Sequence, residues 1–459
     1  MTSEDPRRVI EAVWRIESAR VIAGLARMTG DVGLAEELAQ DALVAALEQW
    51  PQAGVPENPG AWLMLTAKHR AIDLLRRRTR YEHKLREVGR DLEVRQEAAE
   101  AGLDDALDDH IGDDVLRLLF TACHPVLPVE GRLALTLRLL GGLTTQEIAR
   151  AFLVPEPTVG QRISRAKRTL AEKRVPIELP PPAELPGRLA SVLEVVYLVF
   201  NEGYSATAGD DWARPSLCEE ALRLGRVLAG LMPGEAEVHG LVALMEIQAS
   251  RIPARTGPDG EPVLLGDQDR NLWDRLLVRR GLEALGRAEA LGTLGPYGLQ
   301  AAIAACHARA RSTGDTDWER MAALYRLLAH VAPSPVVELN RAVAVGMAYG
   351  PARGLEIVDG LAEEKALRGY PQLPAVRGDL LARLDRHDEA REEFERAAAL
   401  TRNERERALF LSRAAAPSGG RGEHLGQAGE GVGSVSRVDR PPRDGHGGVQ
   451  HAGVQAAGP

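Results

Sequence analysis

Arginine and glutamine side chains gather near the middle of the chain, on a stretch with helical periodicity. Four apolar residues recur there at spacings of four, three and four, which predicts one stripe that packs against a core. They are Val159, Ile163, Ala166 and Leu170. The polar residues between them face outward, and arginine and glutamine can each form paired hydrogen bonds with the edge of a DNA base. The candidate base-reading residues are Thr158, Gln161, Arg162, Arg165 and Arg168.

A preceding helix is needed to position these side chains. Thr144-Thr145-Gln146-Glu147 fits a capping box, in which a threonine and a glutamate satisfy each other's free backbone N–H groups. The prolines in Leu153-Val154-Pro155-Glu156-Pro157 must end this helix, because proline lacks an N–H group and restrains the residue before it. A second helix then begins near Pro157 or Thr158, which gives the form of a DNA-binding helix-turn-helix. The buried face of the first helix is expected to comprise Ile148, Ala149 and Phe152.

The formal net charge of the chain is −9, but its charges are segregated. The stretch from Lys68 to Arg90 is basic, the stretch from Asp91 to Asp114 is acidic, and the stretch from Arg132 to Arg174 is basic again. Phosphate attraction acts over about a Debye length, roughly 8 to 10 Å, so local charge matters more than net charge. Two basic modules on an acidic connector predict two nucleic-acid contacts, and solvated helix faces explain the charge alone equally well.

The stretch from Gly30 to Arg80 predicts two helices of opposite charge, separated by a loop with proline and glycine. The first helix is expected to bury Leu34, Leu38 and Leu47 and to expose an acidic ridge of Glu36, Glu37, Gln40 and Asp41. The second helix starts around Pro59. Acid on one helix and base on the next predict two different partners. The second helix is expected to bury Trp62, Leu63, Leu65, Ile72 and Leu75, and to expose Lys68, His69, Arg70, Arg76 and Arg77.

Three segments in this order and spacing carry a resemblance to a known family. AEELAQDAL, WLMLTAKHRAIDLLRRRTR and GGLTTQEIARAFLVPEPTVGQRISRAKRTL resemble the second and fourth regions of bacterial RNA polymerase sigma factors of the extracytoplasmic-function (ECF) group. The similarity covers approximately Val9 to Arg174. It implies a protein that is not an enzyme, needs no cofactor, binds core RNA polymerase and directs it to promoter DNA.

The resemblance also implies a role for individual residues. Glu36, Glu37, Gln40 and Asp41 fall where the family binds the clamp helices of the polymerase β′ subunit, and the β subunit is a further expected partner. The helix from Pro157 to Leu170 falls where the family reads the upstream promoter element as duplex. In the family the acidic connector enters a basic channel of the polymerase, so Asp104, Asp105, Asp108 and Asp109 are expected to imitate RNA charge. The residues that fall where the family engages and opens the downstream element are Trp62, Lys68, His69, Arg70, Asp73, Arg76 and Arg77.

The second half of the chain is also expected to be helical. PPPAELPG, from Pro180 to Gly187, is a stiff spacer that marks a boundary. Beyond it, FNEGYSAT, GDQDRNLWD and GPYGLQAAIAACHARA resemble the C-terminal extension of one ECF subgroup, which implies control through that extension without a separate anti-sigma factor. Two sets of residues have the spacing of tetratricopeptide repeats, in which small residues let paired helices pack closely. They are Ala342, Gly354, Val358 and Leu361, and then Gly378, Ala390, Phe394 and Ala397.

The predicted fold is therefore all-α, with two small helical sigma domains, a repeat-like helical extension and a disordered tail. The expected domains are a region 2 domain over 1–90, an acidic linker over 91–114, a region 4 domain over 115–175, and a proline-rich linker over 176–187. The extension is expected over 188–416, with repeats near 318–411, and the tail over 417–459.

Other classes of function find little support in the residues. No long apolar run suggests a membrane span and no secretory signal is visible, so a cytoplasmic location is expected. Adjacent Cys123-His124 and Cys306-His307 lack the ligand spacing of a zinc site, and no metal is expected. Glu202, Asp267, Asp269 and Arg270 could form a ligand site, but helix caps and buried pairs are the plainer interpretation.

The alternative to a sigma factor is a one-component transcription regulator with the same helix-turn-helix and a C-terminal sensor. The segment WLMLTAKHRAIDLLRRRTR argues against it, because an operator-binding regulator has no use for a strand-opening module.

Overall fold

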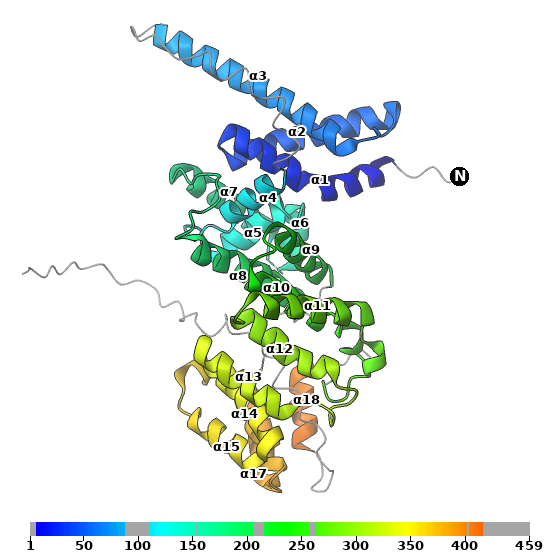
Figure 1. The fold of residues 1–459 in the computed structure, drawn as a ribbon, viewed down its shortest axis with the longest axis vertical. Helices are drawn as coiled ribbons and strands as arrows, with labels where there is room; N and C mark the ends of the chain where they lie inside the picture. Colours follow the sequence, from blue (N-terminus) through cyan, green and yellow to red (C-terminus); the bar gives the residue numbers. More distant parts are fainter. Residues whose placement is uncertain are drawn as a thin grey trace, which may run out of the picture. The chain divides into compact units, whose positions relative to one another are not determined.

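The computed structural model describes residues 6–87, 111–152, 154–204, 215–257, 263, 265–401 and 404–415. Within these ranges the chain is helical and forms no β-strand, which confirms the all-α prediction (Figure 1). The acidic connector with Asp104, Asp105, Asp108 and Asp109 lies outside the described residues, as does the glycine-rich tail. The chain divides into two compact units, which are residues 1–263 with 268–311, and residues 264–267 with 312–459.

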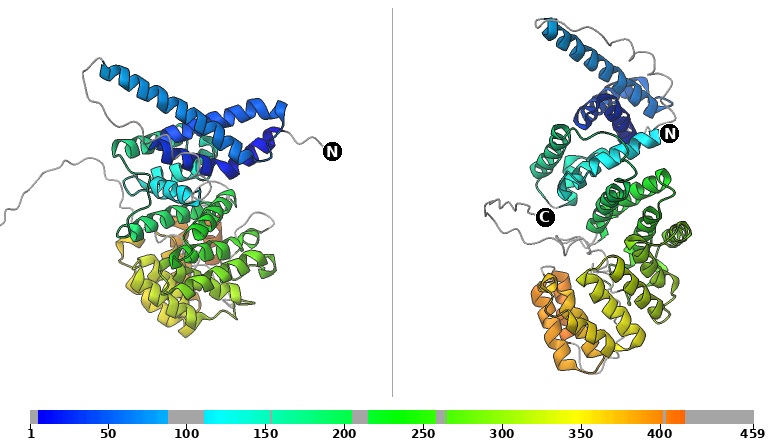
Figure 2. Two further views of the ribbon diagram at one scale, coloured as in Figure 1. Left: turned by 45° about the horizontal axis from the view of Figure 1, so that its top comes forward. Right: turned by 60° about the vertical axis from the view of Figure 1, so that its left-hand side comes forward.

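Three helices form the N-terminal module of the first unit. The Asp31 carboxylate starts the second helix by accepting hydrogen bonds from the N–H groups of Gly33 and Leu34, at 2.7 and 3.1 Å. Gly54 ends this helix at φ 87°, a conformation that favours glycine. The third helix is the longest and runs beyond its two neighbours (Figure 2). The helices are α1 (Pro6–Thr29), α2 (Val32–Ala53) and α3 (Pro59–Glu87).

Two leucines of this module lie outside the core, where the sequence predicted them inside. Leu47 is 41% exposed and Leu65 is 55% exposed, so both predictions are wrong. The buried face of α2 is formed largely by alanines, whose small side chains let the helices approach closely. Leu47 lies one position beyond the buried Ala46, and adjacent side chains on a helix point about 100° apart. Leu38 and Leu63 are buried as expected.

Four shorter helices follow in the same unit and contain the predicted helix-turn-helix. They pack around Leu118, Phe120, Leu135 and Leu137, all of which are fully buried. Their order is α4 (Ile111–Ala122), α5 (Val129–Leu139), α6 (Thr145–Ala151) and α7 (Glu156–Glu172).

The rest of the first unit is built around a central helix that is buried on all sides. This helix is α10 (Ala236–Ala249), and every residue from Val238 to Ala249 is buried. A helix hydrophobic all round belongs in a core, which explains why its sequence lacks an amphipathic pattern. Its neighbours are α8 (Leu185–Tyr204), α9 (Pro215–Leu231), α11 (Arg275–Leu291), α12 (Pro296–Arg309) and the short turns η1 (Ile252–Ala254) and η2 (Arg270–Leu272).

Helix α8 packs directly against α4 and α5. Arg132 of α5 donates hydrogen bonds to Ser191 Oγ at 2.6 Å and to Glu194 Oε2 at 3.0 Å. Ser191 Oγ in turn donates to the carbonyl of Cys123 at 2.7 Å, and Arg188 donates to the carbonyl of Phe120 at 2.8 Å. The start of the extension therefore forms one packed body with the helix-turn-helix module.

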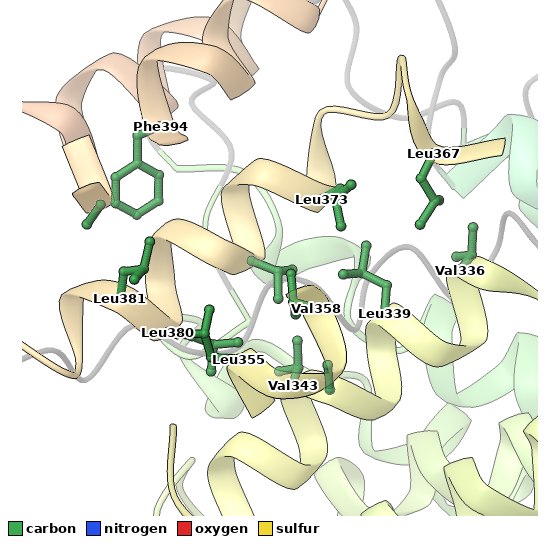
Figure 3. Close-up of a cluster of buried hydrophobic side chains, with 13 residues drawn as sticks. Val336, Leu339, Val343, Leu355, Val358, Leu367, Leu373, Leu380, Leu381 and Phe394 are labelled. Carbon is green, nitrogen blue, oxygen red and sulfur yellow. The ribbon is translucent and has the colours of Figure 1, made fainter. Parts of the chain in front are cut away.

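The second unit consists of helices that pack in consecutive pairs and bury two apolar clusters. Figure 3 shows Val336 and Leu339 opposite Leu367 and Leu373, Val343 near Leu355, and Phe394 beside Leu381. The tight approach of the pairs depends on glycine: a Cβ at Gly354 would lie 2.7 Å from the carbonyl oxygen of Ala342. The helices are α13 (Trp318–Val331), α14 (Pro335–Tyr349), α15 (Pro351–Gly360), η3 (Lys365–Leu367), α16 (Gln372–Ala382), α17 (His387–Leu400) and α18 (Glu404–Ala414).

None of the described helices combines the length and apolar character needed to span a bilayer.

Candidate nucleic-acid and polymerase interfaces

The helix-turn-helix starts at the predicted capping box. The Glu147 N–H group donates to Thr144 Oγ1 at 3.1 Å, and the Thr144 N–H group donates to Glu147 Oε2 at 2.8 Å. Arg15 of α1 donates to the other carboxylate oxygen of Glu147 at 2.8 Å. Burial opposes ionisation of Glu147, but the hydrogen bonds from Thr144 and Arg15 outweigh it and lower the pKa of this carboxyl group. The predicted start of α6 is therefore confirmed.

Helix α7 has the predicted apolar stripe. Val159, Ile163, Ala166 and Leu170 are all buried, which confirms the periodicity argument. The helix begins at Glu156, just before the expected start, with Pro155 at its N-cap and Pro157 in its first turn. In α6 and its C-cap, Ile148 and Ala149 are buried, whereas Phe152 is half-buried.

The candidate base-reading side chains lie on the opposite side of α7 from this stripe. Gln161, Arg165 and Arg168 are exposed, and Thr158 and Arg162 are half-buried. Arg168 lies 3.6 Å from Glu172, an exposed pair that contributes little to stability and can separate at low cost. The exposed amide and guanidinium groups have the chemistry to form paired hydrogen bonds in a major groove.

The acidic ridge of α2 is only partly on the surface. Glu37 and Asp41 are exposed and Gln40 is half-buried. The expectation that Glu36 is exposed is wrong, because its side chain is 5% exposed. Its carboxylate accepts hydrogen bonds from Gln40 at 2.6 Å and from Arg138 of α5 at 2.7 Å, and it forms an ion pair with Lys167 of α7.

The basic face of α3 is likewise divided. His69, Asp73, Arg76 and Arg77 are exposed, as predicted for His69, Arg76 and Arg77. Arg70 is half-buried and lies 3.6 Å from Asp41 of the acidic ridge. Lys68 is 8% exposed, so its predicted exposure is wrong. Lys68 lies one helical turn from Met64, on the same row of α3. The terminal methyl group of Met64 would be 3.0 Å from a Cβ at Gly24 of α1, so this row of α3 packs toward α1.

Trp62 lies at the start of α3 and packs edge to face against Trp50 of α2. Their ring centroids are 5.3 Å apart, and the planes are inclined by 69°. Trp62 is half-buried, with part of its surface at the module's exterior, while Trp50 is buried. A partly exposed aromatic ring on the same helix as cationic side chains is suited to stacking an unpaired base.

Ion pairs between distant parts of the sequence were not predicted. Besides the contacts of Glu36, Arg15 pairs with Glu147 at 2.8 Å, and Arg27 pairs with Asp114 at 3.0 Å. The partners are 132 and 87 residues apart in the chain. Periodicity indicates which face of one helix is polar, but it does not indicate which other helix will meet that face.

The polar residues of the extension form structural contacts. Arg270 donates hydrogen bonds to the carbonyls of His307 and Ala310 at 2.6 and 2.7 Å, and Asp269 caps η2 through Asn271. Glu202 is half-buried and Asp267 is exposed. Among the described residues, no cluster of three or more histidine, cysteine, aspartate or glutamate side chains could hold a metal ion.

The three cysteines are buried as free thiols. Burial raises the pKa of Cys123 and Cys218 to about 12, so neither thiol is reactive at neutral pH.

Three family models match separate parts of the chain. Sigma-70 region 2 matches residues 15–81, Sigma-70 region 4 matches residues 117–170, and a family of unknown function (DUF6596) matches residues 188–289. An uncharacterized protein of Rhizobium meliloti is 44% identical over 85% of this chain and 92% of its own length. The protein named "Probable ECF RNA polymerase sigma factor SigI" of Mycobacterium tuberculosis is 25% identical over 39% of this chain and 60% of its own length. No solved structure matches the chain.

Proposed function

Because this chain belongs to the ECF group of RNA polymerase sigma factors, we propose that it selects promoters through two separate surfaces and is controlled through its C-terminal extension. It binds core RNA polymerase and promoter DNA, and it contributes no catalytic group of its own. The single observation that carries the proposal is the exposed row of Gln161, Arg165 and Arg168 on α7, opposite a fully buried apolar stripe.

In this proposal α7 reads the upstream promoter element as duplex DNA. The exposed row can reach base edges, and the capping box fixes α6 as the supporting helix. In this proposal Thr158 and Arg162, which are half-buried at the edge of the row, contact the phosphate backbone.

The downstream element is engaged by α3. Arg70, Arg76 and Arg77 provide a cationic surface on the same helix as His69, and Trp62 offers a ring on which an unpaired base can stack. Asp73 lies on the same exposed side and can accept a hydrogen bond from a base amino group. Lys68 supports the fold in this proposal, because it is buried.

The polymerase contact is formed by the acidic ridge of α2. Glu37 and Asp41 are exposed and available to cationic groups on the β′ clamp helices. Gln40 and Glu36 can contact the same groups only when the helices that cover them move away from α2. The extension regulates this activity, and the direct packing of α8 on α4 and α5 supports that role. In this proposal the protein acts in the cytoplasm and needs no separate anti-sigma factor.

Reconstitution with purified core polymerase tests the proposal. We expect the full chain to form a stable complex with core polymerase and to produce transcripts from defined start sites on genomic DNA fragments. A chain that binds DNA but neither binds core polymerase nor starts transcription would be a one-component regulator.

A Glu37→Lys variant tests the polymerase contact specifically. Reversing an exposed charge should reduce core association at every promoter without changing promoter preference. Glu48→Lys is a matched control, because Glu48 is an exposed glutamate on the same helix and outside the ridge. Equal core affinity of Glu37→Lys and the control would contradict the assigned surface.

A further inference from the structure

One carboxylate of the polymerase-binding ridge is occupied inside the molecule. Glu36 of α2 is held by Arg138 of α5 and Lys167 of α7, and its side chain is 5% exposed. Both cations belong to the helix-turn-helix module, and each of their side chains is 23% exposed. A ridge residue that touches two helices of another module cannot at the same time offer its carboxylate to the polymerase.

The contact between the two modules has further ion pairs. Arg15 of α1 meets Glu147 of α6, and Arg27 of α1 meets Asp114 of α4. Arg15 is 67% exposed and Arg27 is 37% exposed. Interfaces between modules of one chain that depend on such ion pairs resemble transient protein–protein interfaces. When the two modules separate, water hydrates these charges, so no charge is left buried and unpaired.

We propose that the chain closes on itself through an acid-base lock, formed by Glu36, Arg138 and Lys167, and that this lock must open before α2 can bind core polymerase. The proposal rests on the proposed function and adds its control. In the closed form the cationic pair of α5 and α7 occupies the carboxylate that the polymerase would otherwise contact. The affinity for polymerase is then reduced by the fraction of molecules that are closed.

Neutralising the two cations tests the lock. The Arg138→Gln/Lys167→Gln variant keeps hydrogen-bonding capacity and most of the side-chain volume, but removes both charges that hold Glu36. Because the lock no longer holds α2 closed, this variant should bind core polymerase at least about threefold more tightly than the wild type. Arg150→Gln/Lys173→Gln is the matched control, because it removes the same two charge types from exposed positions of the same module.

A cleavable crosslink provides the converse test. A Cβ at Gly33 would lie 3.7 Å from Cδ of Lys167, so cysteines at these two positions can be joined by a short thiol-specific linker. The native thiols are buried and should not react. The crosslinked Gly33→Cys/Lys167→Cys protein should lose at least about tenfold in affinity for core polymerase and regain it when the linker is cleaved.

These experiments separate failure of the lock from failure of the sigma function. If the wild type binds core polymerase, and neither neutralisation nor crosslinking alters its affinity, the lock is overturned while the sigma assignment stands. If no form of the protein binds core polymerase, both are overturned. Circular dichroism and thermal unfolding of each variant identify any loss of affinity that comes from misfolding. Comparing the same folded protein before and after cleavage of the linker then shows whether closure alone lowers the affinity for core polymerase.

Discussion

Glu36 and Glu37 are adjacent carboxylates with opposite surroundings. Glu37 is exposed, whereas Glu36 is enclosed by Arg138 and Lys167. Adjacent residues on a helix point about 100° apart, so one faces water while the other faces a neighbouring module. The sequence predicted that this part of α2 is acidic, but it could not predict the division, because Arg138 is 102 residues away in the chain.

The hydroxyl group of Thr144 should make a measurable contribution to stability. A Thr144→Ala variant removes the acceptor for the Glu147 N–H group and should lower the free energy of unfolding of this module by about 1 kcal/mol. Chemical denaturation measures the change. Thr145→Ala removes a hydroxyl group from the next position and serves as the control; an equal loss in both variants would contradict a specific capping role.

His307 should make the first unit sensitive to acid. Burial, together with the positive charges of Arg251 and Arg270, lowers its pKa from 6.5 to about 3. Between these values the unfolded chain binds the additional proton and the folded chain does not, so stability falls as the pH drops from about 6.5 toward 3. Titration of this residue lowers the free energy of unfolding by at most about 1.4 kcal/mol per pH unit.

A His307→Gln variant tests this acid sensitivity. Glutamine does not titrate, so the variant should lose less stability than the wild type between pH 6.5 and pH 4, whatever its stability at pH 7. Denaturation curves at several pH values provide the measurement. His69→Gln is a suitable control, because His69 is exposed. Parallel pH profiles for His307→Gln and the wild type would contradict the argument.

Among the elements, α6 and α7 were predicted accurately because their determinants are local. A capping box, a proline turn and an apolar stripe all lie within about 30 residues of sequence. By contrast, α10 gives no amphipathic signal because it is buried on every side, and its place at the centre of the first unit depends on four surrounding helices. The packing of α8 on α4 and α5 was also not predicted, since Arg132 and Arg188 meet partners 59 and 68 residues away.

Promoter preference should depend on the exposed row of α7. Arg165→Ala should weaken initiation only at promoters whose upstream element presents a base that this guanidinium reads, by about 1–3 kcal/mol for a good paired contact. Lys173→Ala, at the C-terminal end of α7, is the control for a general loss of charge. Transcription from a library of upstream sequences gives the readout, and an unchanged preference would remove Arg165 from the recognition surface.

Close packing of α14 and α15 should depend on Gly354. A Cβ at this position would lie 2.7 Å from the Ala342 carbonyl oxygen and 3.0 Å from Cα of Gly346, so Gly354→Ala should cost about 1–3 kcal/mol of stability. Gly360→Ala on the same helix meets nothing within 4 Å and should instead stabilise the protein by about 0.4–1 kcal/mol. Thermal unfolding distinguishes the two, and equal midpoints would contradict the packing argument.

Across the whole molecule, the border between the two compact units lies near Arg311. The sequence placed residues 188–416 in one extension, and the repeats that it predicted near 318–411 fall within the second unit. The border depends on which helices share a core: α8 to α12 pack around α10, whereas α14 to α17 share the cluster of Figure 3. The repeat spacing therefore indicates the helices of the second unit, whereas the grouping of α8 to α12 around α10 depends on tertiary contacts.

Truncation should distinguish the border near Arg311 from the proline-rich spacer. A fragment that ends at Arg311 keeps the first unit nearly complete and should unfold at a temperature within about 5 °C of the corresponding transition of the full chain. A fragment that ends at Pro180 loses α8 and its bonds to Phe120, Cys123 and Arg132, and should unfold at a clearly lower temperature. Similar midpoints for the two fragments would contradict the packing of α8.

Helix α7 combines three kinds of surface on 17 residues. Its buried stripe belongs to the core, Lys167 faces Glu36, and the arginines at 165 and 168 point elsewhere into solvent. Each task therefore uses its own set of positions. Under the proposed function, the arginines can be exchanged during evolution to address new start sites while the lysine and the stripe stay fixed. A descendant of this protein could then acquire different target genes and inherit the same restraint.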